Sequence, residues 1–273
     1  MPELPEVEIV ARGLRKVLLE KAISSVNCYS PKIQKDNYPG WMDDLKGSRI
    51  MSIRRRGKNI LIDLSKNRTL WVHLKMTGRF YYRSGTNPTD KHDLMIFEFK
   101  NDKFNLRFND YRRFGRVRLL PTDTIMLQKG LSDLGPEPLE ISLSDFIDLF
   151  RKSSRMIKPA LLDQTFLAGL GNIYADESLY SARIHPRRLT NRISKKKLVQ
   201  LHSIIRKMLK RAIGLMGTSV DSFAGVNGKT GRYQKYLLAY GREGEKCRRC
   251  GGKIRREKIG SRSAHFCPRC QRL

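Results

Sequence analysis

The sequence lacks the features that place a chain in a membrane or export it. It has no run of about 18 consecutive apolar residues, which excludes a membrane-spanning helix, and no segment that pairs a basic face with a large aromatic apolar face. The first residues include Glu3 and Glu6 and no basic stretch followed by an apolar core, so they do not resemble a secretory signal. We therefore expect a cytoplasmic protein with no membrane partner.

Negative charge is also scarce. The 273 residues include 55 Lys and Arg but only 26 Asp and Glu, which gives a formal net charge of +29. Hydrophobic residues make up 40% of the chain, so the sequence predicts one to three folded domains and not a disordered basic tail. A positive excess of this size favours a polyanionic partner such as nucleic acid. The sequence contains no P-loop, no dinucleotide-binding fingerprint and no HExxH motif.

Cysteines are few, and four of the five lie near the C-terminus. They form two pairs, Cys247-x2-Cys250 and Cys267-x2-Cys270, with sixteen residues between the pairs. In a reducing cytoplasm this spacing indicates a zinc site rather than disulfides. Four sulfur ligands complete the tetrahedron of a structural zinc ion and leave no place for a catalytic water. A redox pair or an iron–sulfur site is the alternative. The fifth cysteine, Cys28, is predicted to be a small core residue.

The spacing of apolar residues in the first half of the chain changes from helical to strand-like. Between Glu3 and Leu19 apolar residues recur at intervals of three and four, which predicts an amphipathic helix with acidic residues in its first turn. After the break at Tyr38–Gly40, short apolar runs are separated by Gly, Asn, Lys and Asp, as is typical of a β-sandwich or barrel. The runs predicted to be strands are Ile50–Ile53, Asn59–Leu64, Thr69–Leu74, Leu94–Phe99, Phe104–Phe108 and Arg116–Leu120.

The second half of the chain is predicted to be mostly helical. It begins with a linker at Leu134–Pro138, where Gly and Pro interrupt the pattern. The segments with helical spacing are Ser144–Arg151, a stretch that begins near Pro159, Ile173–Ala182 and the long basic amphipathic stretch Ser194–Met216. Gly217–Arg232 is glycine-rich and is expected to be a mobile loop. Within Lys253–Phe266 two strands are predicted, with a turn at Gly260-Ser261.

The N-terminus is the first of three segments with residues suited to chemistry or DNA binding. If Met1 is removed, Pro2 becomes a secondary amine, which can attack a sugar aldehyde carbon and form a charged iminium. Glu3 and Glu6 lie beside it in the sequence and could transfer protons. From the spacing alone, an ordinary helix beginning is the simpler interpretation of these residues.

The other two segments contain residue types that contact DNA. Met76–Phe80 and Tyr111–Gly115 offer Met, Arg and Phe between predicted strands, and such side chains can wedge a duplex open. The alternative is that the Met and the Phe are buried in the sandwich core. Gly169–Ile173 is a glycine turn entering a helix, where backbone N–H groups can bind phosphate, although this signal is weak by itself.

Together these motifs resemble one family, the bacterial formamidopyrimidine-DNA glycosylases. The resemblance spans the whole chain, and its motifs occur in the family order. They are Pro2–Glu8, His73–Phe80, Arg112–Gly115, Gly169–Ala175 and the terminal four-cysteine module. The resemblance implies an α+β protein of three domains, with an N-terminal antiparallel β-sandwich that carries the first helix (1–133), a helix–two-turn–helix domain with a lesion-capping loop (134–236), and a zinc-finger β-hairpin (237–273).

The resemblance also implies a bifunctional DNA glycosylase and AP lyase of base-excision repair. Such an enzyme excises 8-oxoguanine and formamidopyrimidines from duplex DNA after the damaged nucleotide has been flipped out of the stack. The N-terminal proline forms a Schiff base with the sugar, and β- and δ-elimination follow. We therefore expect a monomer that binds damaged double-stranded DNA in the bacterial cytoplasm at the nucleoid, with one structural zinc ion as its cofactor.

The resemblance assigns roles residue by residue. Pro2 and Glu3 match the nucleophile and the residue that protonates the opened sugar, and Lys58 and Arg262 match phosphate-binding residues counted with the catalytic set. The residues expected to contact DNA or order the site around it are Glu6, Met76, Arg112, Phe114, Lys158, Asn172 and Lys229. Among these, Met76, Arg112 and Phe114 match the side chains that fill the space left by the flipped base. The zinc ligands are Cys247, Cys250, Cys267 and Cys270.

Two other functions remain open on the sequence. An endonuclease VIII-type glycosylase would share the architecture and the nucleophile but act on oxidised pyrimidines; Leu4 and the set of Met76, Arg112 and Phe114 favour the purine enzyme. A non-catalytic zinc-finger protein would share the net charge and the four cysteines, but it would have no use for a free Pro2.

Overall fold

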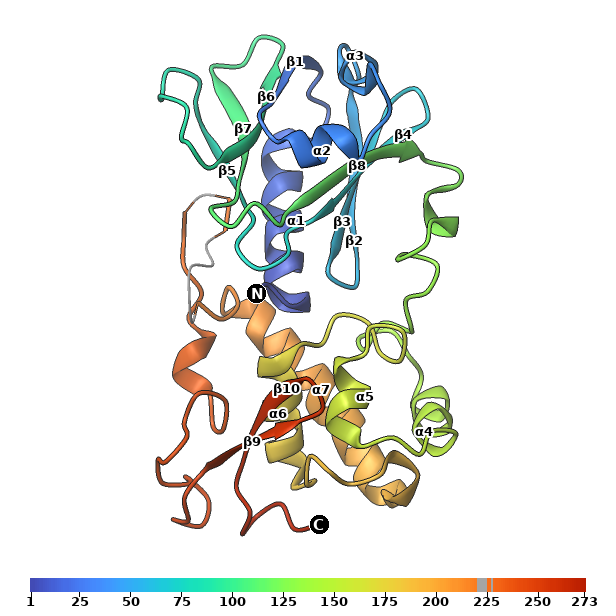
Figure 1. Ribbon diagram of the computed structural model, residues 1–273, viewed down its shortest axis with the longest axis vertical. Helices are drawn as coiled ribbons and strands as arrows, with labels where there is room; N and C mark the ends of the chain where they lie inside the picture. Colours follow the sequence, from blue (N-terminus) through green and yellow to red (C-terminus); the bar gives the residue numbers. More distant parts are fainter. Residues whose placement is uncertain (220–224, 227) are drawn as a thin grey trace. The chain divides into compact units, whose positions relative to one another are not determined.

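The computed structural model describes residues 1–219, 225–226 and 228–273. The chain forms two compact units (Figure 1). The first, here the sandwich unit, combines Met1–Ser132 with Leu215–Arg232, and the second, the helical unit, combines Asp133–Gly214 with Tyr233–Leu273. The division into three domains remains a prediction; in the structure the glycine-rich segment belongs to the sandwich unit, and the cysteine module (237–273) belongs to the helical unit.

The sandwich unit begins with helix α1 (Leu4–Leu18), which confirms the helix predicted over Glu3–Leu19. Glu3 is its N-cap and forms a capping box with Glu6, and Pro5 occupies the first turn, where the missing N–H costs nothing. The apolar face of α1 is buried. Glu3 and Glu6, the two glutamates that follow Pro2 in the sequence, therefore also determine where the helix begins.

Two four-stranded antiparallel sheets form the body of this unit (Figure 1). The first sheet has the order β1 (Ile23–Cys28), β6 (Asp93–Phe99), β7 (Phe104–Asn109) and β5 (Arg79–Ser84). The second has the order β2 (Ile50–Arg56), β3 (Asn59–Leu64), β4 (Arg68–His73) and β8 (Arg116–Pro121). The short elements around them are α2 (Pro31–Lys35), α3 (Trp41–Leu45) and η1 (Ile125–Leu127).

One continuous apolar core joins α1 to both sheets. Leu14 of α1, Ile60 of β3 and Phe108 of β7 are all fully buried in it. The predicted β-sandwich is therefore confirmed, as are the six predicted strands. Strands β1 and β5 were not predicted, because most of their residues are only half-buried and carry no apolar run.

The helical unit contains four main helices and one hairpin. The helices are α4 (Leu143–Arg151), α5 (Ile157–Leu162), α6 (Asn172–Ala182) and α7 (Lys195–Gly214), with 3-10 turns η2 (Thr190–Arg192) and η3 (Tyr233–Tyr236). The hairpin pairs β9 (Arg255–Ile259) with β10 (Arg262–Phe266). Helix α6 is buried almost all round, and α7 packs against both α4 and α6. The predicted helices and the predicted turn at Gly260-Ser261 are confirmed.

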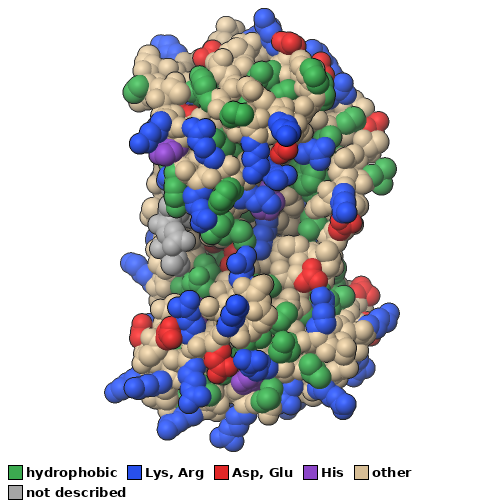
Figure 2. Space-filling view, viewed as in Figure 1, with side chains coloured by type: hydrophobic (Ala, Val, Ile, Leu, Met, Phe, Trp, Pro, Cys, Tyr) green, Lys and Arg blue, Asp and Glu red, His purple; other side chains and the backbone are tan. Residues whose placement is uncertain are grey.

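Lys and Arg side chains are spread over the visible face of each unit in Figure 2. Acidic side chains are fewer there, in keeping with the net charge of +29. Within the described parts of the chain, no helix is both long and apolar enough to cross a membrane.

Candidate active site and nucleic-acid interface

The N-terminal residues are held by the carboxylate of Glu6. Pro2 is buried, and the side chains of Glu3 and Glu6 are each only 2% exposed. Glu6 Oε2 accepts a hydrogen bond from the backbone N–H of Glu3 at 2.9 Å, and its Oε1 accepts one from the backbone N–H of Thr218 at 2.8 Å. Glu6 thus ties the backbone next to Pro2 to the beginning of the glycine-rich segment.

Two glycines allow the glycine-rich segment to pass close to Glu6 and to fold back closely on itself. A Cβ on Gly217, which has a φ of +74°, would lie 2.8 Å from Glu6 Oε1. A Cβ on Gly231 would lie 2.2 Å from the carbonyl oxygen of Gly217. Lys229 is exposed, and its carbonyl accepts a hydrogen bond from the backbone N–H of Gly225. The rest of the predicted capping loop, residues 220–224 and 227, lies outside the described residues.

Lys58 lies in the two-residue turn between β2 and β3 and is 7% exposed. The turn is fixed by Arg55, whose guanidinium donates to Glu8 of α1 at 3.0 Å and to the carbonyl of Gly57 at 3.0 Å. Burial alone would raise the pKa of Glu8, but hydrogen bonds from Arg12 and Arg55 lower it below its usual range. Helix α1 therefore positions both the N-terminus and the turn that carries Lys58.

His73 ends β4 close to these cations. Burial, together with the charges of Lys75 and Lys58, lowers the pKa of His73 to about 3. Its Nδ1 accepts a hydrogen bond from the backbone N–H of Lys75 at 2.9 Å. His73 is therefore neutral at pH 7, with its proton on Nε2.

The predicted wedge residues lie on two loops of the sandwich unit, Leu74–Gly78 and Asp110–Gly115. Met76 is 42% exposed and Phe114 is 45% exposed. Arg112 is also exposed, and its guanidinium lies over the Phe114 ring, 5.0 Å from the centroid. The alternative that the Met and the Phe fill the sandwich core is wrong. Exposed apolar side chains next to an arginine are of the type that can insert between the bases of a duplex.

In the helical unit, Asn172 and Lys158 meet at the N-terminus of α6. Asn172 is the first residue of the helix, and its buried Oδ1 has no hydrogen-bond partner among the residues that the structure describes. The Lys158 side chain is fully buried, with Nζ 2.5 Å from Asp176 Oδ1 and 3.2 Å from the carbonyl oxygen of Asn172. An amide at a helix N-terminus suits a phosphate, whereas the ammonium of Lys158 is engaged within the protein.

The hairpin that carries Arg262 packs on the same helices. Arg262 is exposed and follows the turn at Gly260, where an added Cβ would lie 3.4 Å from the side chain of Pro159 on α5. On β10, the backbone N–H of His265 donates to Asp176 Oδ2 at 3.0 Å, and the His265 ring lies at the same distance from this oxygen. Asp176 thus connects Lys158, and through it Asn172, with the hairpin of Arg262.

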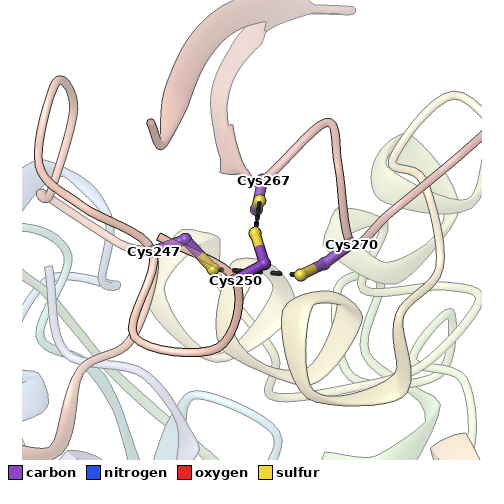
Figure 3. A group of neighbouring side chains, drawn as sticks. All are labelled: Cys247, Cys250, Cys267 and Cys270. Carbon is purple, nitrogen blue, oxygen red and sulfur yellow. Dashed lines mark hydrogen bonds between the residues drawn. The ribbon is translucent and has the colours of Figure 1, made fainter. Parts of the chain in front are cut away.

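The four cysteines face one another in the cysteine module (Figure 3). Their sulfurs all lie within 4.8 Å of one another, with Cys247 and Cys270 3.9 Å apart and Cys250 and Cys267 3.5 Å apart. Zinc–sulfur bonds of about 2.3 Å in a tetrahedron place the sulfurs about 3.8 Å apart. The cysteines therefore form a site for one structural zinc ion, which leaves no open position for a water.

Residues around the cysteines support this site. The Tyr180 hydroxyl on α6 lies 3.1 Å from Cys247 Sγ, where it would donate to a thiolate. The buried carboxylate of Glu177 accepts hydrogen bonds from the backbone N–H groups of Leu238, Ala239 and Tyr240. Burial raises the pKa of Glu177 above its usual range.

The structure brings the predicted residues together within each unit. The sandwich unit holds Pro2, Glu3, Glu6, Lys58, Met76, Arg112, Phe114 and Lys229, and the helical unit holds Lys158, Asn172, Arg262 and the four cysteines. The buried acids that connect these groups, above all Asp110, Asp176 and Glu177, were not predicted from the sequence. For Asp176 and Glu177 the sequence signal is an acidic pair in the middle of a helix with no other charged residue.

Three family models match this chain in order. Residues 1–117 match the formamidopyrimidine-DNA glycosylase N-terminal domain, and residues 134–224 match the formamidopyrimidine-DNA glycosylase H2TH domain. Residues 244–273 match the zinc finger found in FPG and IleRS. The matches follow the predicted succession of sandwich, helical segment and finger.

Similar proteins cover the chain from end to end. A curated formamidopyrimidine-DNA glycosylase of Pelotomaculum thermopropionicum is 45% identical over 100% of both chains. A complex of Lactococcus lactis Fpg with abasic-site DNA has a TM-score of 0.92 at 37% identity, over 99% of this chain and 100% of that one. A crystal structure of wild-type Lactococcus lactis Fpg with N7-benzyl-Fapy-dG DNA gives 0.92 at 38% identity, over 100% of both chains.

Proposed function

The chain belongs to the formamidopyrimidine-DNA glycosylase family, and from that premise we propose that it excises oxidised purines from duplex DNA and cleaves the strand. Its substrates are 8-oxoguanine and formamidopyrimidines, and its place is base-excision repair. One observation carries the proposal at this chain's own residues: Pro2 lies at the N-terminus beside the buried carboxyl groups of Glu3 and Glu6. A protein that only binds DNA has no need of this arrangement.

The reaction begins at the nitrogen of Pro2, which becomes a secondary amine when Met1 is removed. This nitrogen forms a bond to C1′ of the damaged nucleotide as the bond from C1′ to the base breaks. The base leaves with the bonding electrons and takes up the proton that the Pro2 nitrogen loses. Glu3 supplies a proton to the sugar ring oxygen as the ring opens, which gives an iminium between Pro2 and C1′. The iminium accepts electrons and permits β- and then δ-elimination, which leave a one-nucleotide gap with phosphate at both ends.

Contacts with the DNA backbone position the lesion. Lys58, Asn172 and Arg262 are proposed to bind phosphates, which fix the register of the protein and make affinity fall with salt. Lys229 is a further candidate of this kind. Lys158 is a weaker one, because its buried ammonium bonds to Asp176 and to the Asn172 carbonyl. Met76, Arg112 and Phe114 would occupy the space left by the flipped nucleotide, with Arg112 facing the orphaned cytosine.

The partner is damaged double-stranded DNA, and we infer that the protein acts as a monomer. Its proposed location is the bacterial cytoplasm at the nucleoid, without a membrane partner. The zinc ion is structural: it holds the finger that presents Arg262 and takes no part in the chemistry.

A single gel tests this function. A duplex with 8-oxoguanine opposite cytosine is incubated with the protein, with and without borohydride. A trapped covalent complex together with a one-nucleotide gap bearing phosphate at both ends is the expected result. Cleavage of a thymine-glycol duplex in preference to 8-oxoguanine would instead identify the endonuclease VIII type, and neither trapping nor cleavage on either duplex would leave a DNA-binding protein without chemistry.

The state of the N-terminus gives an independent test. The amine of Pro2 can attack only after Met1 has been removed, so the intact mass of the active enzyme should lack one methionine. Active enzyme that retains Met1 would contradict Pro2 as the nucleophile.

A further inference from the structure

One buried carboxylate connects the two wedge loops, Leu74–Gly78 and Asp110–Gly115. Asp110 is 0% exposed. Its Oδ1 accepts hydrogen bonds from the Thr77 hydroxyl in the first loop and from the backbone N–H of Arg112 at 3.1 Å. Its Oδ2 accepts from the backbone N–H groups of Phe114 at 2.9 Å and Gly115 at 2.7 Å. Four donors from both loops therefore converge on one side chain.

The loop that contains Asp110 is tightly folded. Arg113 has a positive φ of 54°, and its N–H donates to the backbone carbonyl of Asp110. A Cβ on Gly115 would lie 2.5 Å from Cζ of the buried Phe108. The backbone is thus folded back on the carboxylate while the side chains of Arg112 and Phe114 remain outside.

The first loop is equally tight. A Cβ on Gly78 would lie 2.4 Å from the carbonyl oxygen of Leu74, to which the Gly78 N–H donates at 3.0 Å. Lys75 has a positive φ of 54°. Between these constraints, Thr77 points to Asp110, and its neighbour Met76 is exposed.

We propose that Asp110 is a positioning residue that locks the two loops into one rigid wedge. The proposal rests on the proposed function, in which Met76, Arg112 and Phe114 enter the duplex. Opening a base stack consumes binding free energy, and loops that had to become ordered at the same time would consume more. An ionised carboxylate only accepts hydrogen bonds, so it satisfies four donors without needing an acceptor itself.

Asp63 offers a matched comparison within the same unit. It is a carboxylate on β3 whose side chain is 13% exposed, and it accepts hydrogen bonds from Arg54, Ser52 and Thr69. Like Asp110 it accepts several hydrogen bonds, but its donors are side chains that include the Arg54 cation, and none of them belongs to a wedge loop. Asp63→Asn therefore shows how the sandwich unit responds when a hydrogen-bonded carboxylate is lost away from the wedge loops.

The test compares Asp110→Asn, Thr77→Val and Asp63→Asn on two substrates. The amide of Asp110→Asn places an NH2 group against backbone donors, and Thr77→Val removes only the bond between the loops. Single-turnover excision of 8-oxoguanine from a duplex should fall roughly 10- to 100-fold in Asp110→Asn and less in Thr77→Val. Cleavage of an abasic site in single-stranded DNA should stay within about twofold of wild type, because that substrate has neither an opposite base nor a stacked partner to displace.

The base opposite the lesion supplies a readout that a merely structural role would not change. Arg112 faces that base, so the preference for cytosine over adenine should decrease in Asp110→Asn and remain in Asp63→Asn. Equal losses on both substrates, with a lower unfolding midpoint than that of Asp63→Asn, would make Asp110 a folding residue and overturn the proposal. Normal duplex excision in both Asp110→Asn and Thr77→Val would also overturn it. The double variant Met76→Ala/Phe114→Ala tests the wedge itself. Full activity of this variant would contradict the proposed insertion of Met76 and Phe114 into the duplex, and not only the role of Asp110.

Discussion

The sandwich unit and the cysteine module hold their candidate functional side chains in different ways. In the sandwich unit, Pro2, Lys58 and the wedge loops are attached to a large apolar core through buried carboxylates such as Glu6 and Asp110. In the cysteine module, Arg262 belongs to a short hairpin that packs on α6, and Cys247 and Cys267 lie in a separate small apolar cluster. The module combines a small apolar cluster with four cysteines that can hold a metal ion, whereas the sandwich unit has one large apolar core.

This difference predicts in which region a substitution can abolish activity without changing the free energy of folding. A large core tolerates the loss of a functional side chain at its edge, because the free energy of folding comes from residues elsewhere. A small metal-held module has no such reserve, since metal binding supplies the free energy of folding. Both tryptophans, Trp41 and Trp71, lie in the sandwich unit, so their fluorescence reports its unfolding separately from that of the module.

The largest effect is expected from Pro2→Gly. Excision and strand cleavage should fall by about 100-fold or more, because the positioned secondary amine that forms the iminium is lost. Borohydride trapping on an 8-oxoguanine duplex measures this. Binding to DNA that contains a non-cleavable abasic analogue and the tryptophan-monitored unfolding curve should both match those of wild type. Equal activity would contradict the assigned nucleophile.

The next effect is expected from Cys267→Ser in the module. Loss of one sulfur should release zinc and unfold the hairpin, and DNA affinity should fall on the order of 10- to 100-fold as the Arg262 contact disappears. Zinc content and fluorescence anisotropy measure the two changes. Cys28→Ser is the matched control, because Cys28 lies outside the module. Unchanged affinity after confirmed zinc loss would show that the finger does not contact DNA, and a shifted tryptophan unfolding curve would break the separation between the two regions.

A smaller effect is expected from Glu6→Gln, because Glu6 holds two backbone N–H groups and is not proposed to react with the substrate. Both Glu6 oxygens accept backbone N–H donors, and the glutamine would present an NH2 group to either Glu3 or Thr218. We expect excision to fall roughly tenfold and amide exchange at Thr218 to accelerate, as a lost buried hydrogen bond predicts. Glu20→Gln is the control, since the Glu20 side chain is 67% exposed. Normal exchange at Thr218 would exclude Glu6 as the connection to the glycine-rich segment.

The features that were predicted from sequence depend on neighbouring residues. Helix α1 was located within one residue at each end, because its capping glutamates and apolar spacing are local. The zinc ligands were predicted because two CxxC pairs encode a ligand geometry within a few residues. Strand β5 was missed because it lies at the edge of its sheet, where Tyr81 and Arg83 remain partly exposed.

The features that sequence analysis missed depend on distant residues. Asp110 meets Thr77 across 33 positions, and Asp176 meets His265 across 89. A carboxylate in a sequence gives no indication of which backbone N–H groups will converge on it. The candidate catalytic residues could therefore be proposed from their motifs, whereas the buried acids that hold the surrounding backbone became visible only in the fold.

The smallest effect concerns stability at acidic pH, which His73 should change in the sandwich unit but not in the cysteine module. His73 has a pKa of about 3 in the folded sandwich, well below its usual 6.5. Below pH 6.5 the unfolded chain binds a proton at this position that the folded chain does not bind, so stability is lost as the pH falls from 6.5 towards 3. The loss attributable to His73 between pH 7.5 and 5.5 is about 1 kcal/mol.

His73→Gln should remove this part of the pH dependence. Denaturant unfolding followed by tryptophan fluorescence at the two pH values should give a smaller acid-induced loss in the variant than in wild type. Acid release of zinc should be unchanged, because protonation of the four thiolates governs it. An identical loss of stability in both proteins would mean that His73 becomes protonated in the folded state. That result would contradict the assignment of a neutral His73 beside Lys58.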